Sequence, residues 1–238
     1  MFGLSDRGPP APPPAVAAPL PDLIGEDLAC RRGERLVFAG ASFRVPTGGA
    51  LVLTGANGTG KSSLLRLVAG LLTPAAGRLL WGTTPVAEDL AGHRSRLNYV
   101  GHPDALKAAV TPREMLVFWA ALRGQSLRRA APVLDQALAA FALDAIADWP
   151  CGWLSAGQRR RVALARLLAA PAPLWLLDEP MTALDAPSQA RLLEAIAAHR
   201  AAGGMVIIAS HAPMLEASVA LVLDDLAAGF VPDPAWGG

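Results

Sequence analysis

Eight consecutive residues, Gly55 to Ser62, have the types and spacing of a phosphate-binding loop. They match the pattern G-x-x-x-x-G-K-[ST] at every fixed position. Glycines let such a loop curl so that its N–H groups point inward at phosphate, and the Lys61 ammonium can then reach the β- and γ-phosphates of a nucleotide. The sequence therefore predicts nucleotide binding by a continuous run: Gly55, Ala56, Asn57, Gly58, Thr59, Gly60, Lys61, Ser62 and Ser63.

Two acidic residues, Asp178 and Glu179, follow the apolar run Leu174–Leu177. An acid at the carboxyl end of a central parallel strand lies beside the ligand site of an α/β protein. Together with the Ser62 hydroxyl, Asp178 can hold Mg²⁺, directly or through water. Glu179 can polarise an attacking water as a general base. Without an upstream phosphate loop the two acids would be explained as the polar edge of a strand; with the loop they predict hydrolysis.

A strand, a loop and a helix must position the phosphate-binding residues, and the sequence predicts all three. Ala50–Thr54 is a short apolar strand, and Ser62–Ala69 repeats apolar residues at helical spacing. Gly70 is a stop signal for this helix. Upstream, Leu36–Val45 alternates in polarity and predicts strands joined by a turn. This order is the first half of a parallel α/β unit.

A helical stretch separates the phosphate loop from the two acids. Pro103–Leu143 lacks strand signals, and Thr111 opens a capping box that predicts a helix through Leu122. Ser155 and Gln158 have the S-x-x-Q spacing of another capping box, which predicts a second helix that begins there. The α/β pattern then returns in four segments, namely Leu174–Leu177, Pro187–Arg200, Met205–Ala209 and Val219–Leu223. We expect an α/β fold with a mainly parallel sheet, an N-terminal antiparallel β part and a helical subdomain.

The composition limits the classes of protein that this chain can represent. Apolar residues make up 53% of the 238 residues, yet no run approaches the roughly 20 apolar residues of a membrane-spanning helix. A formal net charge of +1 gives no electrostatic reason to expect nucleic acid. The two isolated cysteines and four histidines show neither a disulfide framework nor metal-ligand spacing. Any membrane role must therefore come through a partner.

The segment Leu154–Gln158 carries a family resemblance. Within one chain its evident role is to cap a helix. It resembles the signature of ABC ATPases, usually LSGGQ, with Ala156 in place of the first glycine, and the resemblance extends over nearly all of Leu28–Leu223. It implies a P-loop ATPase core that binds ATP and Mg²⁺ and in which Lys61 and Glu179 are catalytic.

The resemblance also implies that the signature acts on the opposite subunit. The Ser155 hydroxyl and the Gly157 backbone, with Gln158 beside them, would cradle the γ-phosphate bound by a second ATP-binding domain. Two such sites require a head-to-tail dimer with two-fold symmetry. Asp185 resembles the family's D-loop aspartate and can also cap the helix that follows. His211 resembles the switch histidine of the family. A neutral imidazole at that position can form a hydrogen bond with the γ-phosphate and hold the attacking water against the general base.

Two positions depart from the family pattern. His102 stands where the family usually has a glutamine, and it could meet Mg²⁺-bound water or sense the interface with a transporter. The family often stacks an aromatic side chain on adenine upstream of the phosphate loop, whereas the matching region here is Ala29–Gly33. The planar guanidinium of Arg32 could stack on adenine instead.

The composition of the two ends and the resemblance of the rest divide the chain into five expected parts. Residues 1–22 form a Pro/Ala-rich disordered leader, 23–102 the first part of the ATP-binding core, and 103–154 the helical subdomain. Residues 155–224 form the second part of the core, and 225–238 a flexible tail.

Several details resemble the ATP-binding subunits of cytochrome c maturation (heme) exporters. They include Gly101-His102, the arginine run after the signature, Leu174-Trp175 and Leu79–Gly82. That narrower family implies multi-pass membrane partners at the cytoplasmic face of the inner membrane. The chain itself has no heme-attachment motif. Two alternatives stay open: the ATPase of another ABC exporter or importer, and a non-transport ABC ATPase, which would carry tandem domains or a long insertion.

Overall fold

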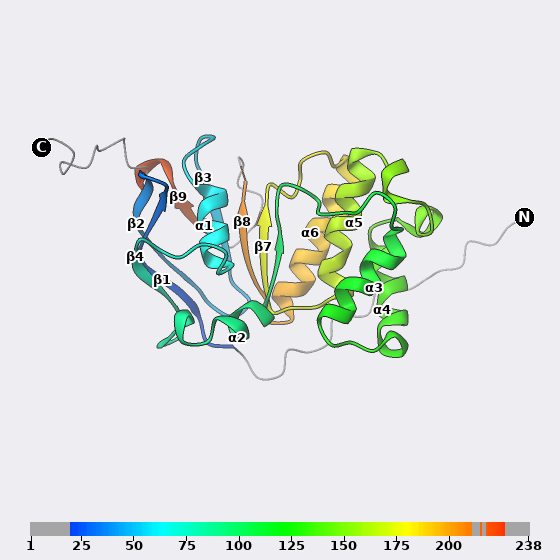
Figure 1. Cartoon of the computed structure of the whole chain (residues 1–238), viewed down its shortest axis with the longest axis horizontal. Helices are drawn as coiled ribbons and strands as arrows, with labels where there is room; N and C mark the ends of the chain where they lie inside the picture. The colour runs from blue at the N-terminus through cyan, green and yellow to red at the C-terminus, as the bar shows by residue number, and fades with distance from the viewer. Residues whose placement is uncertain (1–19, 211–214, 216–217, 227–238) are drawn as a thin grey trace, which may run out of the picture.

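Two sheets and two groups of helices make up the fold (Figure 1). The computed structural model describes residues 20–210, 215 and 218–226. Most of the predicted leader, most of the predicted tail, and His211 lie outside the described residues. In the part that is described, no helix is long and apolar enough to cross a membrane.

The central sheet has five strands in the order β6 (Leu97–Val100), β7 (Leu174–Asp178), β8 (Met205–Ala209), β3 (Ala50–Thr54) and β9 (Val219–Val222). Every neighbouring pair is parallel. The described fold confirms the predicted α/β class, with its parallel sheet, antiparallel sheet and helices. Three of these strands, β3, β7 and β8, were predicted as short apolar runs, as is typical of parallel strands that are covered on both faces.

Alternate residues of the parallel strands enter two separate cores. Trp175, Leu177 and Ile208 pack with the helices after residue 110, whereas Leu174 and Ile207 pack with α1 and the antiparallel sheet. The period of two residues along a strand produces this division. Burying one such side chain contributes about 2 kcal/mol, so both faces of the sheet hold its strand ends in place.

The antiparallel sheet corrects one sequence prediction. Its order is β2 (Arg35–Val45), β1 (Leu23–Arg32), β4 (Ala76–Trp81) and β5 (Thr84–Pro85). Leu36–Val45 is therefore part of one continuous strand rather than two strands joined by a turn. Gly40, whose positive φ suits a turn, instead lies in a bulge opposite β1.

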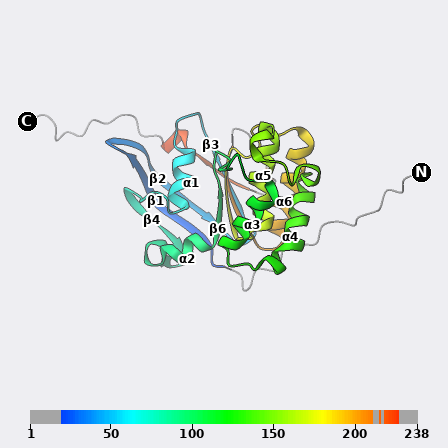
Figure 2. The same ribbon diagram turned by 45° about the vertical axis from the view of Figure 1, so that its right-hand side comes forward.

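Helices cover both faces of the parallel sheet, and Figure 2 shows the same division after a 45° turn. α1 lies between the two sheets, whereas α3 to α6 lie on the other face (Figure 1). The helices are α1 (Lys61–Val68), α2 (Leu90–Ser95), α3 (Pro112–Leu122), α4 (Leu127–Ala140), α5 (Ala156–Ala169) and α6 (Ala186–Ala201), with 3₁₀ turns η1 (Val86–Glu88), η2 (Asp144–Ile146), η3 (Cys151–Trp153) and η4 (Asp224–Leu226).

Local signals fix the helix ends. α1 stops at Gly70, where the amides of Gly70 and Leu71 donate to the carbonyls of Leu67 and Arg66, a Schellman arrangement. The capping box predicted at Thr111 is confirmed, because its side chain accepts from the Glu114 amide and the Glu114 carboxylate accepts from the Thr111 amide. These caps satisfy backbone groups that a helix end otherwise leaves unpaired.

Two buried histidines link helices to the sheets. The imidazole of His199 on α6 stacks on Trp175, with ring centroids 3.9 Å apart and an interplanar angle of 8°. His93 accepts a hydrogen bond at Nδ1 from the Trp81 indole, so its Nε2–H donates to the Val68 carbonyl. Burial lowers the pKa of both imidazoles, and that of His199 falls to about 4. Both rings are therefore neutral in the fold near neutral pH.

We expect the free energy of unfolding to fall as the pH drops from 6.5 towards 4. In this window the unfolded chain binds a proton at His199 that the folded chain does not, because the folded pKa is about 4. The loss attributable to His199 is about 3 kcal/mol, and it levels off below the folded pKa. Urea unfolding at a series of pH values measures it. His199→Gln, which keeps a neutral N–H donor, should flatten the profile; an unchanged slope in this variant would contradict the assignment.

Candidate active site

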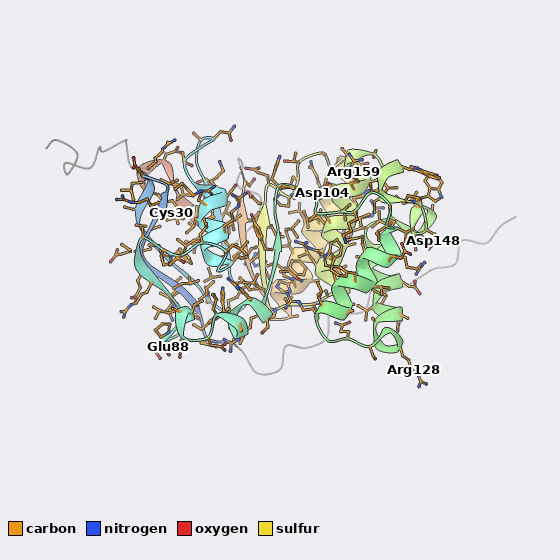
Figure 3. The ribbon with its side chains drawn as sticks, viewed as in Figure 1. Cys30, Glu88, Asp104, Arg128, Asp148 and Arg159 are labelled. Carbon is orange, nitrogen blue, oxygen red and sulfur yellow. The ribbon has the colours of Figure 1, made fainter. Side chains whose placement is uncertain are left out.

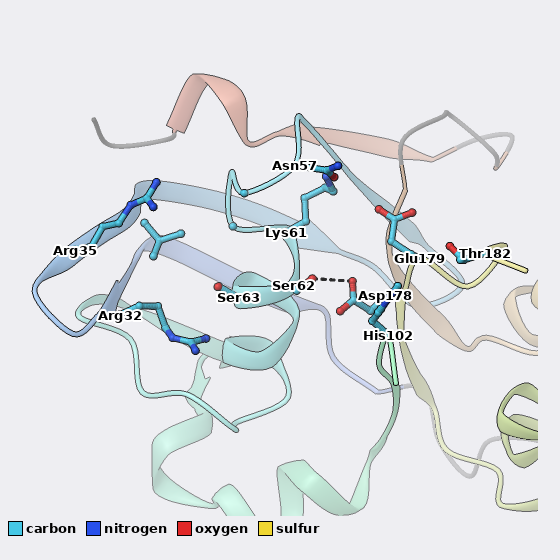
Figure 4. Close-up of a pocket in the computed structure, with 13 residues that line it drawn as sticks. Arg32, Arg35, Asn57, Lys61, Ser62, Ser63, His102, Asp178, Glu179 and Thr182 are labelled. Atoms are coloured by element: carbon cyan, nitrogen blue, oxygen red, sulfur yellow. Dashed lines mark hydrogen bonds between the residues drawn. The ribbon is translucent and has the colours of Figure 1, made fainter. Parts of the chain in front are cut away.

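The carboxyl ends of β3, β6 and β7 lie at one edge of the parallel sheet, where a cavity of about 630 Å³ opens (Figure 4). The phosphate loop follows β3, Asp178 ends β7, and His102 comes shortly after β6. The cavity is lined by Arg32, Arg35, Val37, Asn57, Gly58, Gly60, Lys61, Ser62, Ser63, His102, Asp178, Glu179 and Thr182. The fold thus brings together most of the residues that the sequence pattern selected.

The phosphate loop is shaped by glycines that have positive φ. Gly60 has φ +109°, and a Cβ there would lie 2.8 Å from the side chains of Val37 and Phe38. Gly60 also precedes α1, whose N-terminus has no side-chain cap. The first-turn amides of a helix have no partner within the helix, so those of Lys61, Ser62 and Ser63 can be offered to an anion. This geometry fits the triphosphate of a nucleotide.

Three predicted loop residues support the loop and do not line the cavity. The Thr59 hydroxyl donates to the Ala56 carbonyl at 3.0 Å. The Ala56 amide donates to the carboxylate of Asp224, at 3.0 and 3.2 Å from its two oxygens. Gly55 has φ +139° at the start of the loop. Asp224 follows β9, more than 160 residues along the chain, and sequence spacing gave no sign of this contact.

Lys61 is only 7% exposed and is held by its own loop. Its Nζ donates to the carbonyls of Gly55 at 2.7 Å and Ala56 at 3.1 Å. The ammonium is therefore fixed over the loop on the side of the cavity (Figure 4). A third donor of the ammonium can be directed at phosphate oxygens, since Lys has three N–H groups.

A pair of oxygen ligands lies at the base of the cavity. The Ser62 hydroxyl donates to Asp178 Oδ1 at 2.9 Å, drawn as a dashed line in Figure 4. Asp178 is 1% exposed, and its Oδ2 accepts from the Tyr99 hydroxyl at 3.4 Å. Burial is the main cause of the raised pKa of Tyr99, which keeps this hydroxyl a donor. A hydroxyl and a carboxylate are hard oxygen ligands, so the donor set fits Mg²⁺.

Glu179 enters the same cavity from the turn after β7. Its backbone has φ +47°, a conformation that is unfavourable for a residue with a side chain. Its amide donates to the Ala209 carbonyl at 3.1 Å, which ties the turn to the end of β8. The Glu179 residue therefore lies on the wall of the same cavity as Lys61 and Asp178.

Sequence reasoning missed three residues on the cavity wall: Arg35, Val37 and Thr182. Arg35 and Val37 lie on β2, and Arg35 pairs with Arg32 across a two-residue turn between β1 and β2. Reading Gly33-Glu34 as a hairpin turn would have found Arg35. Thr182 follows Glu179 by three residues, and its amide donates to the Glu179 carbonyl at 3.2 Å.

The signature residues lie in a different depression of this chain. Ser155 and Gln158 form a capping box at the start of α5, with bonds of 3.2 and 2.8 Å. Gly157 and Asp185 share that depression and do not line the phosphate cavity. Asp185 caps α6 by accepting from the Ser188 amide, as expected, and its hydrogen bonds to Ser188 lower its pKa.

The fold and the cavity define a P-loop nucleotide hydrolase. The family model for ABC transporters matches residues 38–182, and this match covers more than half of the chain. The chain therefore belongs to the ABC transporter family and is an ATP-binding subunit that hydrolyses ATP.

Relatives and solved structures agree with this assignment. The "Cytochrome c biogenesis ATP-binding export protein CcmA" of Rhodospirillum rubrum is 54% identical over 227 residues, 94% of each chain. The protein of the same name from Paramagnetospirillum magneticum is 54% identical over 187 residues, 79% of this chain and 86% of that one. An ABC transporter ATP-binding protein from Pyrococcus furiosus shares the fold, with TM-score 0.75 and 24% identity over 87% of this chain and 100% of that one. So does cbiO1 from Clostridium perfringens, part of the ABC transporter complex cbiONQ, with TM-score 0.68 and 25% identity over 80% and 78% of the two chains.

Proposed function

We propose that this chain is the ATP-hydrolysing subunit of a heme exporter complex of the cytochrome c maturation type. The observation that carries the proposal is the 54% identity, over 94% of both chains, to a protein named as a cytochrome c biogenesis export ATPase. The cavity that combines Lys61, Ser62, Asp178 and Glu179 supplies the ATP-driven step.

The geometry supports a division of labour among the site residues. The amides at the start of α1 and the Lys61 ammonium would bind the phosphates, and Ser62 and Asp178 would hold Mg²⁺. The ion, when bound, would supply positive charge against the charge that develops on the phosphates. Glu179 accepts a proton from the attacking water. His211, which lies outside the described residues, is proposed to hydrogen-bond the γ-phosphate and hold the attacking water against Glu179. His102, which lines the cavity, is proposed to meet Mg²⁺-bound water or to sense the interface with the transporter.

Two copies of the chain are proposed to complete each site. Ser155 and Gly157 lie away from the phosphate cavity of their own chain, in the depression that also contains Asp185. A head-to-tail dimer would place this depression over the γ-phosphate bound by the other copy, so that each ATP is bound between two chains. ATP binding would close the pair and hydrolysis would reopen it.

The proposed domain division follows the same mechanism. Residues 23–102 and 155–224 form the ATP-binding core, and residues 103–154 form a helical subdomain that transmits closure to multi-pass membrane subunits. The complex would lie at the cytoplasmic face of the inner membrane, with this chain bound peripherally. No bound nucleic acid and no heme attached to this chain are expected.

The second candidate is the ATPase of another ABC exporter or importer, because the family match itself carries no information on cargo. Purification of the tagged chain from detergent-solubilised membranes separates the two candidates. We expect multi-pass proteins that copurify with heme. Recovery with a complex that contains no heme, such as an importer with a solute-binding protein, would overturn the heme exporter assignment and leave the ATPase assignment standing.

We predict that Arg32→Ala raises the Kd for ATP roughly tenfold, since a guanidinium stacked on adenine contributes about 1 kcal/mol or more. Arg32 lines the cavity at the end opposite Glu179, beside Arg35 (Figure 4). Fluorescent-nucleotide titration measures the change. Arg31→Ala is the matched control, because Arg31 carries the same charge and does not line the cavity. Equal affinity in the Arg32 variant and the wild type would remove the stacking hypothesis.

A further inference from the structure

Arg160 is a buried cation that the ATP-hydrolysis scheme leaves without a role. It lies in the second turn of α5 and is only 3% exposed. Its guanidinium donates to the carbonyls of Pro180 (3.3 Å), Gly101 (2.8 Å), Asp178 (2.8 Å) and Glu179 (2.9 Å), and to the Asp104 carboxylate (3.2 Å). Four of these five acceptors are backbone carbonyls.

Three of the carbonyls belong to one short stretch of chain. Asp178 ends β7, Glu179 and Pro180 begin the turn that follows, and Glu179 has φ +47°. A residue with a side chain in that region costs about 1–2 kcal/mol and persists only where its surroundings hold it. The Arg160 guanidinium binds the carbonyls of all three residues, so it fixes both peptide planes around Glu179.

The other two acceptors lie in the segment that enters the helical part of the chain. Gly101 and Asp104 flank His102, and Arg160 Nη1 binds both. Figure 3 shows Asp104 between the carboxyl edge of the sheet and α5. One side chain therefore connects the signature helix, the turn of Glu179 and the segment of His102.

We propose that Arg160 is a positioning residue that holds Glu179 in its catalytic conformation and makes that placement depend on the segment Gly101–Asp104. The proposal rests on the proposed role of Glu179 as general base. Arg160 itself does not line the phosphate cavity. Its planar fork of donors matches carbonyls in several directions, which a lysine ammonium cannot reproduce from the same stem.

An ordinary structural anchor would have a different arrangement. A buried arginine held for charge balance pairs with carboxylates, whereas Asp104 is the one carboxylate among the five acceptors of Arg160 in the described part of the chain. Three of the other four acceptors are the carbonyls of Asp178, Glu179 and Pro180, around the turn that carries Glu179. A misplacement of about 1 Å at a reacting group can lower a rate by roughly a hundredfold without changing substrate contacts.

Arg160→Lys tests the proposal in the full chain with Mg-ATP. We expect kcat to fall roughly a hundredfold while the Kd for ATP changes less than about threefold. Arg123→Lys is the control, since Arg123 also donates to carbonyls, those of Ser95 and Leu97, at the opposite end of β6. It should lower the Tm without the selective loss of kcat. An unchanged kcat for Arg160→Lys, or equal losses in kcat and binding, would overturn the proposal.

The double variant Arg160→Lys/Glu179→Gln tests the positioning role of Arg160 separately from the role of Glu179 as the base. If Arg160 acts through Glu179, Arg160→Lys lowers the residual rate no further in a Glu179→Gln background. Full additivity there would overturn the proposal even if Glu179 is the base, whereas undiminished turnover by Glu179→Gln alone would remove the base assignment.

Asp104→Ala gives a second readout should Arg160→Lys fail to fold. It removes one acceptor and leaves the four carbonyl bonds. We expect kcat to fall several-fold with the Kd for ATP unchanged. A wild-type kcat in this variant would overturn the dependence of Glu179 on the segment Gly101–Asp104.

Discussion

Glu179→Gln should bind Mg-ATP with wild-type affinity and hydrolyse it roughly a thousandfold more slowly, since a positioned general base contributes about 10²- to 10⁴-fold. The substitution keeps the size of the side chain and removes the carboxylate of Glu179, a residue of the cavity wall that we propose as the proton acceptor. With hydrolysis blocked and binding retained, the ATP-bound pair should accumulate as a dimer. Phosphate release measures the rate, and light scattering after size exclusion measures the dimer.

The matched control for this variant is Glu194→Gln, which makes the same chemical change on the exposed face of α6. It should hydrolyse ATP at the wild-type rate. Undiminished turnover in Glu179→Gln would exclude Glu179 as the base and return attention to His102, which lines the same cavity.

Lys61→Ala should lose binding and turnover together. The ammonium is fixed by the carbonyls of Gly55 and Ala56 and supplies a charged donor to the phosphates. Losing one charge-assisted hydrogen bond to phosphate costs about 1.5–3 kcal/mol, which raises the Kd for ATP roughly 10- to 100-fold. Isothermal titration with ATP measures the affinity, and the rise in Tm on adding ATP should disappear with it.

Lys107 is the chain's other lysine; it is exposed and does not line the cavity. Lys107→Ala removes the same charge and should leave ATP affinity unchanged. A Lys61→Ala variant that still bound ATP with wild-type affinity would mean that the backbone amides alone hold the phosphates.

The parts of the fold that sequence predicted well are those with strong local signals. β3 and β8 were predicted with their observed bounds, and the α5 start followed from Ser155 and Gln158. β1 was missed as a strand because Gly25, Glu26 and Asp27 interrupt its polarity pattern. The structure places a bulge there, with Asp27 at φ +47°. A bulge breaks the two-residue period on which strand prediction depends.

Prediction of the candidate site is also limited to residues that local sequence patterns reveal. Lys61, Ser62, Asp178 and Glu179 could be found because motif types and strand ends place them. Arg160 could not be found in this way, because the role proposed for it depends on hydrogen bonds to carbonyls 18 to 59 residues away in sequence. Backbone acceptors leave no residue type to recognise, so only the folded chain shows that this arginine reaches Glu179.

The left-handed backbone at Glu179 also has a consequence for how this chain can change over time. Glycine adopts φ +47° freely, so Glu179→Gly should relieve about 1 kcal/mol of strain while removing the carboxylate. Selection for thermal stability alone would then favour glycine at this position, and selection for turnover would favour glutamate. A library screened only for folding at high temperature should therefore be enriched in inactive variants at position 179. Thermal stability and ATPase activity thus favour different residues at this position.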